Sequence, residues 1–330
     1  MRKSVFVIAE AGVNHNGSLD VAFKLIDAAV EAGADAVKFQ TFSAERLVSK
    51  DAMLAEYQRR NLDVPITQYE MLKKLELSKD AHKALMTYCR NKGILFCSTA
   101  FDVEDVLYLH SLNMPFMKSP SGEITNLPYL RSLDACRKPV LLSTGMATLE
   151  EVAAAVAAFK NSQLTLLHCT TEYPCPYAAV NLNAMITLQE KFGFPVGYSD
   201  HTLGIDVPIA AVAMGASVIE KHLTLDRDLE GPDHKASLVP SEFKAMVSSI
   251  RRIEDALGDG EKEPSTIERK NIVVARKSIV ARTAIKKGDV FSEMNLTTRR
   301  PGNGMSPMEW DRLIGTVSKC NYCAGQLINE

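Results

Sequence analysis

Two lysines in this sequence lie within apolar segments, where a charged side chain needs a partner. Lys38 lies in the run Val37-Lys38-Phe39, and Lys118 lies in Phe116-Met117-Lys118. Burying an ammonium group is costly unless it meets an anion. Lysine charge combined with hydroxyl donors would bind a phosphate and a carboxylate, and the alternative is that both lysines form internal salt bridges to carboxylates. The hydroxyl residues that could take part are Ser98, Thr99, Ser121, Ser143 and Ser199.

Two histidines, His201 and His222, each follow a short apolar segment late in the chain. A pair of neutral imidazoles suits a divalent transition-metal ion and leaves positions open for water and for substrate oxygens. Two imidazoles without a carboxylate are a small set of metal ligands. The alternative is therefore that both histidines have a structural or hydrogen-bonding role. His168 is expected in the core, whereas His82 and His110 are expected at the surface of helices.

Three carboxylates complete the set of residues that could do chemistry. Glu10 ends the apolar run Val5-Phe6-Val7-Ile8-Ala9, and a carboxylate there could orient a water molecule or accept a proton. Glu123 and Asp233 could each hold sugar hydroxyls. Any of the three, taken alone, could instead cap a helix or pair with a cation.

Positioning these residues requires a scaffold, and the hydrophobic pattern predicts one. Short apolar runs alternate with amphipathic stretches, which is typical of parallel strands joined by crossover helices. A closed barrel of eight such units needs about 250 residues. We therefore predict an α/β fold, a (β/α)8 TIM barrel. The eight predicted strands are Val5–Glu10, Ala36–Phe42, Ile94–Ala100, Phe116–Ser121, Pro139–Gly145, Leu164–Thr170, Pro195–Asp200 and Val218–Leu223.

The predicted barrel explains why the polar residues occur where they do. In such barrels the active site forms at the carboxyl ends of the strands, and each of the eight predicted ends carries polar side chains. Strands seven and eight are neighbours in a closed barrel, so His201 and His222 should meet at one rim. Expected helices include residues 19–32 and 79–92, each followed by the glycine that commonly ends a helix.

The last part of the chain predicts a second, small domain. We expect the barrel over residues 1–258, a polar linker over 259–272, and a module of short strands and turns over 273–330. A module of fewer than about 60 residues is marginally stable alone. Cys320 and Cys323 form a CxxC pair there, but with no second pair nearby we expect two half-buried thiols.

The composition excludes several classes of protein. With 46% hydrophobic and 24% charged residues, the chain is an ordinary globular protein. Its net charge of −2 argues against nucleic acid as a partner. Seven scattered cysteines indicate no disulfide framework and favour the cytoplasm. No uncharged apolar stretch approaches the roughly 18 to 20 residues that cross a bilayer, so no membrane is expected.

Seven motifs, in order along nearly the whole chain, resemble the sialic acid synthase family, which includes N-acetylneuraminate, legionaminate and pseudaminate synthases. The tail resembles the antifreeze-like (SAF) domain that ends these enzymes. The motifs are Ile8-Ala9-Glu10-Ala11-Gly12-Val13-Asn14-His15-Asn16-Gly17, Val37-Lys38-Phe39-Gln40-Thr41-Phe42, Lys118-Ser119-Pro120-Ser121-Gly122-Glu123, Leu142-Ser143-Thr144-Gly145-Met146, Ser199-Asp200-His201-Thr202, Glu220-Lys221-His222 and Gly231-Pro232-Asp233.

The resemblance implies a metal-dependent condensation of phosphoenolpyruvate with an N-acetylated amino sugar, with carbon–oxygen cleavage and release of phosphate. It implies that His201 and His222 bind the metal, most often Mn²⁺, with Mg²⁺ or Co²⁺ as alternatives, and that Glu10 is catalytic. The residues implied to bind substrates are Lys38, Gln40, Asn61, Thr99, Lys118, Ser121, Glu123, Ser143, Thr171, Tyr173, Ser199, Asp233 and Arg300.

The resemblance also implies a domain-swapped homodimer. In the family, the antifreeze-like domain closes the active site of the partner subunit, and Arg300 holds the position of its sugar-contacting arginine. Asn61 is matched to a sugar contact in a loop of variable length. Thr171 stands where part of the family has asparagine, so this sugar contact departs from the family pattern.

Within the family we predict an N-acetylneuraminate synthase acting on N-acetylmannosamine. The alternative is N,N'-diacetyllegionaminate synthase, whose 2,4-diacetamido-2,4,6-trideoxymannose lacks the 6-hydroxyl. A pseudaminate synthase fits the tail less well. From another class, the chain could be a non-catalytic sugar-phosphate sensor, but such a protein should have lost some of Glu10, Lys38, Lys118, His201 and His222.

Overall fold

A computed structural model describes residues 4–62 and 65–330 of the chain, and its first part is a closed barrel of eight parallel strands. The strands follow one another around the barrel in sequence order, and β1 closes it by pairing with β8. The predicted TIM barrel is therefore confirmed. The strands are β1 Phe6–Gly12, β2 Ala36–Thr41, β3 Leu95–Ala100, β4 Met117–Ser119, β5 Val140–Ser143, β6 Leu164–His168, β7 Val196–Asp200 and β8 Val218–His222.

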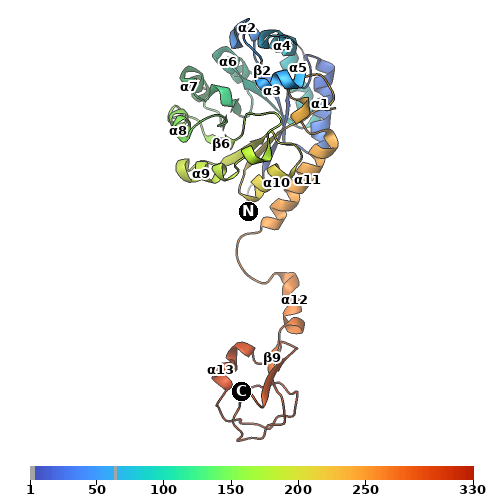
Figure 1. The fold of residues 1–330 in the computed structure, drawn as a ribbon, viewed down its shortest axis with the longest axis vertical. Coiled ribbons are helices and arrows are strands. Elements are labelled where there is room, and N and C mark those ends of the chain that lie inside the picture. Colours follow the sequence, from blue (N-terminus) through green and yellow to red (C-terminus); the bar gives the residue numbers. More distant parts are fainter. Residues whose placement is uncertain (1–3, 63–64) are drawn as a thin grey trace. The chain divides into compact units, whose positions relative to one another are not determined.

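Helices ring the barrel on its outside, as α6, α7, α8 and α9 show in Figure 1. Helices α1 and α5 end at Gly33 and Gly93, both in the left-handed conformation that glycine adopts most readily. The helices of the barrel are α1 Leu19–Ala32, α2 Ala44–Leu47, α3 Glu56–Leu62, α4 Gln68–Leu75, α5 Lys79–Lys92, α6 Val103–Ser111, α7 Leu127–Ala135, α8 Leu149–Ala157, α9 Asn183–Phe192, α10 Asp206–Ala213 and α11 Pro240–Leu257.

Strand alternation separates the side chains into two sets. Successive residues of a strand point to opposite faces, so in β1 Ile8 and Glu10 face the barrel interior while Val7 and Ala9 pack outward. Inside the barrel, an apolar layer forms a floor below the polar strand ends. This layer contains Phe6, Ile8, Ala36, Cys97, Phe116, Leu141, Leu167 and Val218.

Two predictions are wrong. Ser98, predicted among the phosphate-binding hydroxyls, lies on the outer face of β3, where its Oγ is 2.7 Å from Thr41 Oγ1. His82 on α5, predicted at the surface, is buried, and its Nε2 is 2.7 Å from the same Thr41 oxygen. His82 Nδ1 completes the contact by hydrogen bonding to Ser78 O at 2.9 Å. His82 therefore ties helix α5 to strands β2 and β3.

We expect His82→Leu to reduce the free energy of unfolding by about 1 to 3 kcal/mol, because Thr41 loses a buried hydrogen-bond partner. Denaturant unfolding would measure the change. His110→Leu is the matched control, since His110 is exposed on α6 and its replacement should change the free energy by less than about 0.5 kcal/mol. Equal effects of the two substitutions would contradict the structural role of His82.

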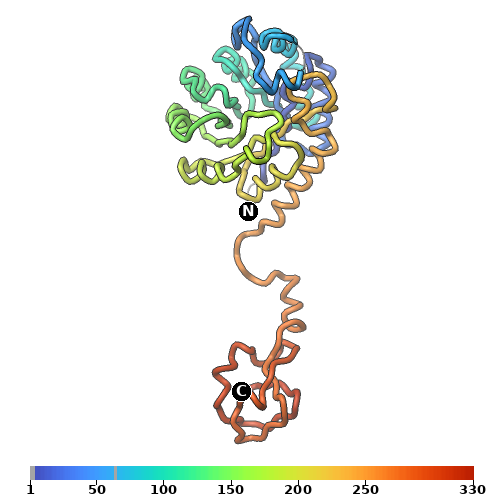
Figure 2. Tube along the Cα trace, viewed as in Figure 1, coloured from blue at the N-terminus to red at the C-terminus, as the bar shows by residue number. Residues whose placement is uncertain are grey.

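The chain divides into two compact units, Met1–Gly258 and Asp259–Glu330. Much of the second unit has no regular secondary structure (Figure 2). Part of the predicted linker folds as helix α12 Thr266–Ala275, which begins with a capping box between Ser265 and Glu268 that the sequence reasoning missed. The second unit also contains strands β9 Ser278–Ala281 and β10 Leu296–Arg299, the 3-10 helix Pro307–Glu309 and helix α13 Trp310–Leu313.

The second unit has a small core of its own, which includes Ile279, Phe291, Leu296 and Tyr322. Strands β9 and β10 pair antiparallel beside this core. Cys320 and Cys323 are both exposed, not half-buried as predicted. Across the described residues of both units, no helix combines the length and the apolar character needed to span a membrane.

Candidate active site

A cavity of about 420 Å³ opens at the carboxyl ends of the barrel strands. The polar inward-facing side chains just above the apolar floor line it, together with loops that follow the strands. The predicted site residues that line the cavity are Glu10, Lys38, Gln40, Thr99, Lys118, Ser121, Glu123, Ser143, Thr171, Tyr173, Ser199, His201, His222 and Asp233. Asn61 and Arg300 are not among its lining residues.

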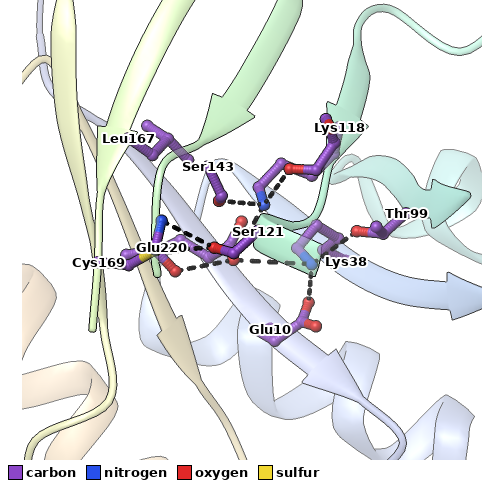
Figure 3. A network of polar contacts seen from close by, with 12 residues as sticks. Glu10, Lys38, Thr99, Lys118, Ser121, Ser143, Leu167, Cys169 and Glu220 are labelled. Atoms are coloured by element: carbon purple, nitrogen blue, oxygen red, sulfur yellow. Dashed lines mark hydrogen bonds and ion pairs between the residues drawn. The ribbon is translucent and has the colours of Figure 1, made fainter. Parts of the chain in front are cut away.

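Lys38 belongs to the network of polar side chains that line the cavity above the apolar floor (Figure 3). Its Nζ is 2.8 Å from Glu10 Oε2 and donates a hydrogen bond of 2.9 Å to Thr99 Oγ1. A second carboxylate, Glu220 Oε1, lies 3.7 Å away. Burial alone would lower the pKa of Lys38, but Glu10 and Glu220 outweigh it and raise the pKa above its ordinary value. Lys38 therefore carries a fixed positive charge.

Lys118 faces the same space from β4. It donates to Ser143 Oγ at 2.7 Å and to Ser119 O at 3.2 Å, and Glu220 Oε1 is 3.8 Å away. Burial lowers the pKa of Lys118, the nearby charge of Lys38 adds to this effect, and Glu220 opposes it without reversing it. Both lysines thus have an internal carboxylate partner, as the alternative proposed, and both still face the cavity.

Glu220 was not among the predicted site residues, yet it lines the cavity. It faces inward from β8, accepts a hydrogen bond of 3.1 Å from Ser199 Oγ, and lies between the two lysines (Figure 3). The signal was present in Glu220-Lys221-His222, since residues 220 and 222 must share a strand face. With Glu10, it balances two buried positive charges.

Beside Lys118, the backbone at Gly145 comes close to three polar side chains. A Cβ atom at this position would lie 2.6 Å from Thr171 Oγ1, 2.7 Å from Ser121 Oγ and 3.0 Å from Cys169 Sγ. Gly145 N donates to Ser121 Oγ at 3.1 Å. Glycine is needed here because any side chain would fill the space between these hydroxyls. The result is a donor-rich corner next to a lysine, which suits a phosphate or carboxylate group.

His201 and His222 meet at the rim, as predicted, with ring centroids 5.6 Å apart. Tyr173 packs on both rings, with centroid distances of 4.1 Å to His201 and 5.6 Å to His222. Burial lowers the pKa of both histidines, so the imidazoles are neutral. Neutral imidazoles retain the lone pairs that bind metal ions.

The donor atoms fit a divalent metal ion. His201 Nδ1 hydrogen bonds to Thr170 O at 2.6 Å, so its Nε2 is the nitrogen that would bind a metal ion. His222 Nδ1 is buried and has no hydrogen-bond partner among the described residues; Asp233 Oδ2 is 3.9 Å away. Within residues 4–62 and 65–330, no group of three or more His, Cys, Asp or Glu side chains could hold a metal. The protein would therefore supply two nitrogens and leave the other positions open.

Two carboxyl groups in the cavity titrate near neutral pH. Burial raises the pKa of Glu10 to about 7, although Lys38 opposes the shift. Burial likewise raises the pKa of Asp233 to about 6. Glu10 also accepts a hydrogen bond of 3.2 Å from Gln40 Nε2. A carboxyl group with a pKa near the working pH can both accept and return a proton.

Of three residues predicted to contact the sugar, Glu123 lines the cavity, whereas Asn61 and Arg300 make other contacts. Glu123 borders the cavity and accepts a hydrogen bond of 2.6 Å from Asn126 Nδ2. Asn61 uses its amide group internally, donating to Pro232 O at 2.7 Å and to Tyr173 O at 3.2 Å, so it supports the loops that carry Tyr173 and Asp233. Arg300 belongs to the second unit and donates to Ala275 O at 2.9 Å.

One wall of the cavity is largely apolar, although Tyr57, Gln58 and Gln68 also line the cavity from the same part of the chain. The sequence patterns did not predict this wall. It is built largely by the connection between β2 and α5, which contains helices α2, α3 and α4. Met71 and Leu75 pack there with Val13 and Phe42 as a small hydrophobic cluster of their own. The apolar residues that line this wall are Val13, Leu47, Val48, Ala55, Met71, Leu72, Leu75 and Phe101.

Comparisons with known proteins agree with this geometry. A model of the NeuB family matches residues 25–262, and a model of the SAF domain matches residues 276–330. A protein from Campylobacter jejuni subsp. jejuni, named N,N'-diacetyllegionaminic acid synthase, is 50% identical, with 99% of this chain and 100% of that protein covered. A protein of the same name from Legionella pneumophila is 50% identical, with 97% of this chain and 92% of that protein covered.

Among solved structures, an N-acetylneuraminic acid (sialic acid) synthetase from Leptospira borgpetersenii is 38% identical. It aligns with a TM-score of 0.73 and covers 82% of this chain and 90% of that chain. The chain is thus more similar in sequence to the two proteins named for legionaminic acid than to this one named for N-acetylneuraminic acid.

Proposed function

This chain belongs to the NeuB family, the sialic acid synthase family that its motifs resemble, and we propose that it joins phosphoenolpyruvate to 2,4-diacetamido-2,4,6-trideoxymannose to make N,N'-diacetyllegionaminate. The observation that carries this choice of sugar is the 50% identity, over nearly the whole chain, to two proteins named for that product. This identity favours N,N'-diacetyllegionaminate as the product over N-acetylneuraminate, the product that we predicted from the sequence. Membership of a family of synthases also argues against the sensor hypothesis.

The two lysines and the hydroxyl groups near them support the binding of phosphoenolpyruvate. Lys38 and Lys118 supply two positive charges, and the hydroxyls of Thr99, Ser121 and Ser143 supply hydrogen-bond donors around them. This arrangement would orient the phosphate and the carboxylate of the substrate and expose its C3 to the sugar. When no substrate is bound, the negative charge of Glu220 partly compensates the positive charges of the two lysines.

Other residues that line the same cavity support the binding of the sugar. His201 and His222 would hold a divalent cation, Mn²⁺ in our proposal, which would polarise the sugar aldehyde as a Lewis acid. Asp233, Tyr173 and Glu123 border the space where the sugar hydroxyls and acetamido groups would lie. The apolar wall would pack against the C6 methyl and the acetamido methyls, which bury favourably there.

The bond changes follow from this arrangement. C3 of phosphoenolpyruvate attacks the aldehyde carbon, and the aldehyde oxygen takes up a proton. Water adds at C2, with Glu10 positioned to orient it and accept its proton. Phosphate then leaves by cleavage of the bond between C2 and oxygen, and the product is a nine-carbon keto acid.

An oxygen label tests which bond of phosphoenolpyruvate breaks. If phosphoenolpyruvate carries ¹⁸O at the oxygen that bridges C2 and phosphorus, we expect the label in the released phosphate, because the bond between C2 and oxygen breaks. Mass spectrometry of the phosphate would measure it. Label retained in the keto acid would instead mean cleavage between phosphorus and oxygen and would contradict the proposed reaction.

We expect Lys118→Met to weaken the binding of phosphoenolpyruvate by roughly 10- to 100-fold, because one charge-assisted hydrogen bond is worth about 1.5 to 3 kcal/mol. Calorimetric titration without sugar would measure the dissociation constant. Lys92→Met is the control, since Lys92 pairs with Asp27 at the surface. An unchanged dissociation constant in Lys118→Met would remove this lysine from the substrate site.

Two further parts of the proposal concern assembly and location. A domain-swapped homodimer, in which Arg300 of the partner subunit contacts the sugar, remains our prediction. So does a cytoplasmic location, which is supported by the absence of disulfides in the described chain, where all seven cysteines are free.

A further inference from the structure

An ion pair that no part of the proposed reaction uses lies directly behind the two histidines. Asp200 and Lys221 are the outward-facing neighbours of His201 and His222, at the ends of β7 and β8. Lys221 Nζ is 2.5 Å from Asp200 Oδ2, and both side chains are 0% exposed. The pair therefore lies between the barrel and its helices, out of reach of substrate.

The hydrogen bonds of this pair are satisfied on both sides. Asp200 accepts from Tyr198 OH at 3.1 Å, from Thr202 N at 3.0 Å and from Thr202 Oγ1 at 3.0 Å, in addition to Lys221. Lys221 also donates to Thr202 O. A buried ion pair gives little net stability when compared with packed apolar residues, so stability alone does not explain the presence of this pair.

The contacts of the pair offer an explanation, because they fix the backbone that carries each histidine. Asp200 and Lys221 are direct partners in the register of β7 and β8. Thr202, on the other side of His201, is held by three of the hydrogen bonds to this pair. His201 thus lies between Asp200 and Thr202, which are both held by these hydrogen bonds. His222 directly follows Lys221 in the chain.

We propose that the Asp200–Lys221 ion pair is a positioning pair that sets the separation and orientation of His201 and His222 for metal binding. The inference rests on the proposed function insofar as the two histidines bind the metal. It adds residues that act through the ligands without touching the metal or the substrate. Residues that orient metal ligands typically change metal affinity by about 10- to 100-fold when they are replaced.

The test is a calorimetric titration of the full chain with manganese chloride alone, without substrates. We expect Asp200→Asn and Lys221→Met each to weaken manganese binding by about 10- to 100-fold. Binding of phosphoenolpyruvate in the absence of metal should stay within about threefold of wild type, because its lysines lie on β2 and β4. This split between metal and phosphoenolpyruvate separates positioning from general damage to the barrel.

Asp134→Asn is the matched control, because Asp134 is also a buried carboxylate that accepts several hydrogen bonds, from Asn161 and Ser162, but far along the chain from either histidine. It should lower the melting temperature and leave manganese affinity unchanged. If Lys221→Met does not fold, Tyr198→Phe removes one donor from Asp200 and should weaken manganese binding by roughly 2- to 10-fold.

The outcomes distinguish this inference from the proposed function. If the wild-type chain binds manganese and the folded variants bind it equally well, the positioning role is wrong while the metal site stands. If Asp134→Asn loses manganese affinity to the same extent as Asp200→Asn, the effect is general instability and the inference is overturned. A wild-type chain that binds no manganese would overturn both the metal assignment and the inference.

Discussion

His222→Ala should lower the rate of phosphate release by about 10³-fold or more, because it removes one of the two nitrogens that hold the metal ion in our proposal. His222 Nδ1 is buried and unpaired within the described chain, and His201 alone would leave a single protein ligand. Polarisation of the aldehyde by a Lewis acid is worth several kcal/mol, and each 1.36 kcal/mol is about a factor of ten in rate. Continuous phosphate detection with saturating substrates would measure the loss.

His168→Ala is a suitable control for this experiment. His168 ends the neighbouring part of the barrel, on β6, but its Nε2 hydrogen bonds to Val180 O at 2.7 Å and it does not join the His201–His222 pair. We expect this variant to retain activity within about tenfold of wild type. A His222→Ala enzyme that keeps both its rate and its manganese requirement would contradict the two-histidine site.

Glu10→Gln should lower kcat by about 10² to 10⁴-fold, the usual contribution of a positioned acid or base. The substitution keeps the shape of the side chain and its contact with Gln40 but removes the ability to accept a proton. In the wild-type enzyme, kcat/KM should fall as the pH drops below about 7, because burial places the pKa of Glu10 near that value. The variant should lack this acidic limb.

Unfolding experiments give a second readout of Glu10. Its pKa rises on folding from an ordinary 4.5 to about 7, so the native state binds more protons than the unfolded state between these values. The contribution of Glu10 to stability is therefore fully present below pH 4.5 and is lost as the pH rises through 7. Glu10→Gln should flatten this part of the pH profile. An unchanged profile, with kcat near wild type, would remove Glu10 from the mechanism.

The barrel could be predicted from the sequence because parallel strands buried on both faces form short, nearly continuous apolar runs. Such runs are easy to count, and glycines such as Gly33 and Gly93 mark where helices end. The same continuity hides which face each residue occupies. Ser98 was therefore assigned to the cavity although it faces α5, and Glu220 was left out although it shares a face with His222.

The rest of the site depends on contacts that periodicity cannot show. His82 lies on a helix whose polar residues predict an exposed face, yet Thr41 and the backbone oxygen of Ser78 offer it hydrogen-bond partners. The apolar wall comes from three short helices between β2 and α5, whose packing on Val13 and Phe42 joins residues distant in sequence. Motif resemblance identified the chemistry, but it could not supply the wall that bears on the choice of sugar.

The choice of sugar can be tested by measuring kcat/KM for phosphate release from phosphoenolpyruvate with manganese, once with 2,4-diacetamido-2,4,6-trideoxymannose and once with N-acetylmannosamine. An apolar wall discriminates against a hydroxyl by roughly 10- to 100-fold, so we expect the diacetamido sugar to be preferred by at least about tenfold. The signal should vanish without sugar. Equal or greater activity with N-acetylmannosamine would contradict the proposed substrate, and no release with either sugar would contradict the proposed reaction.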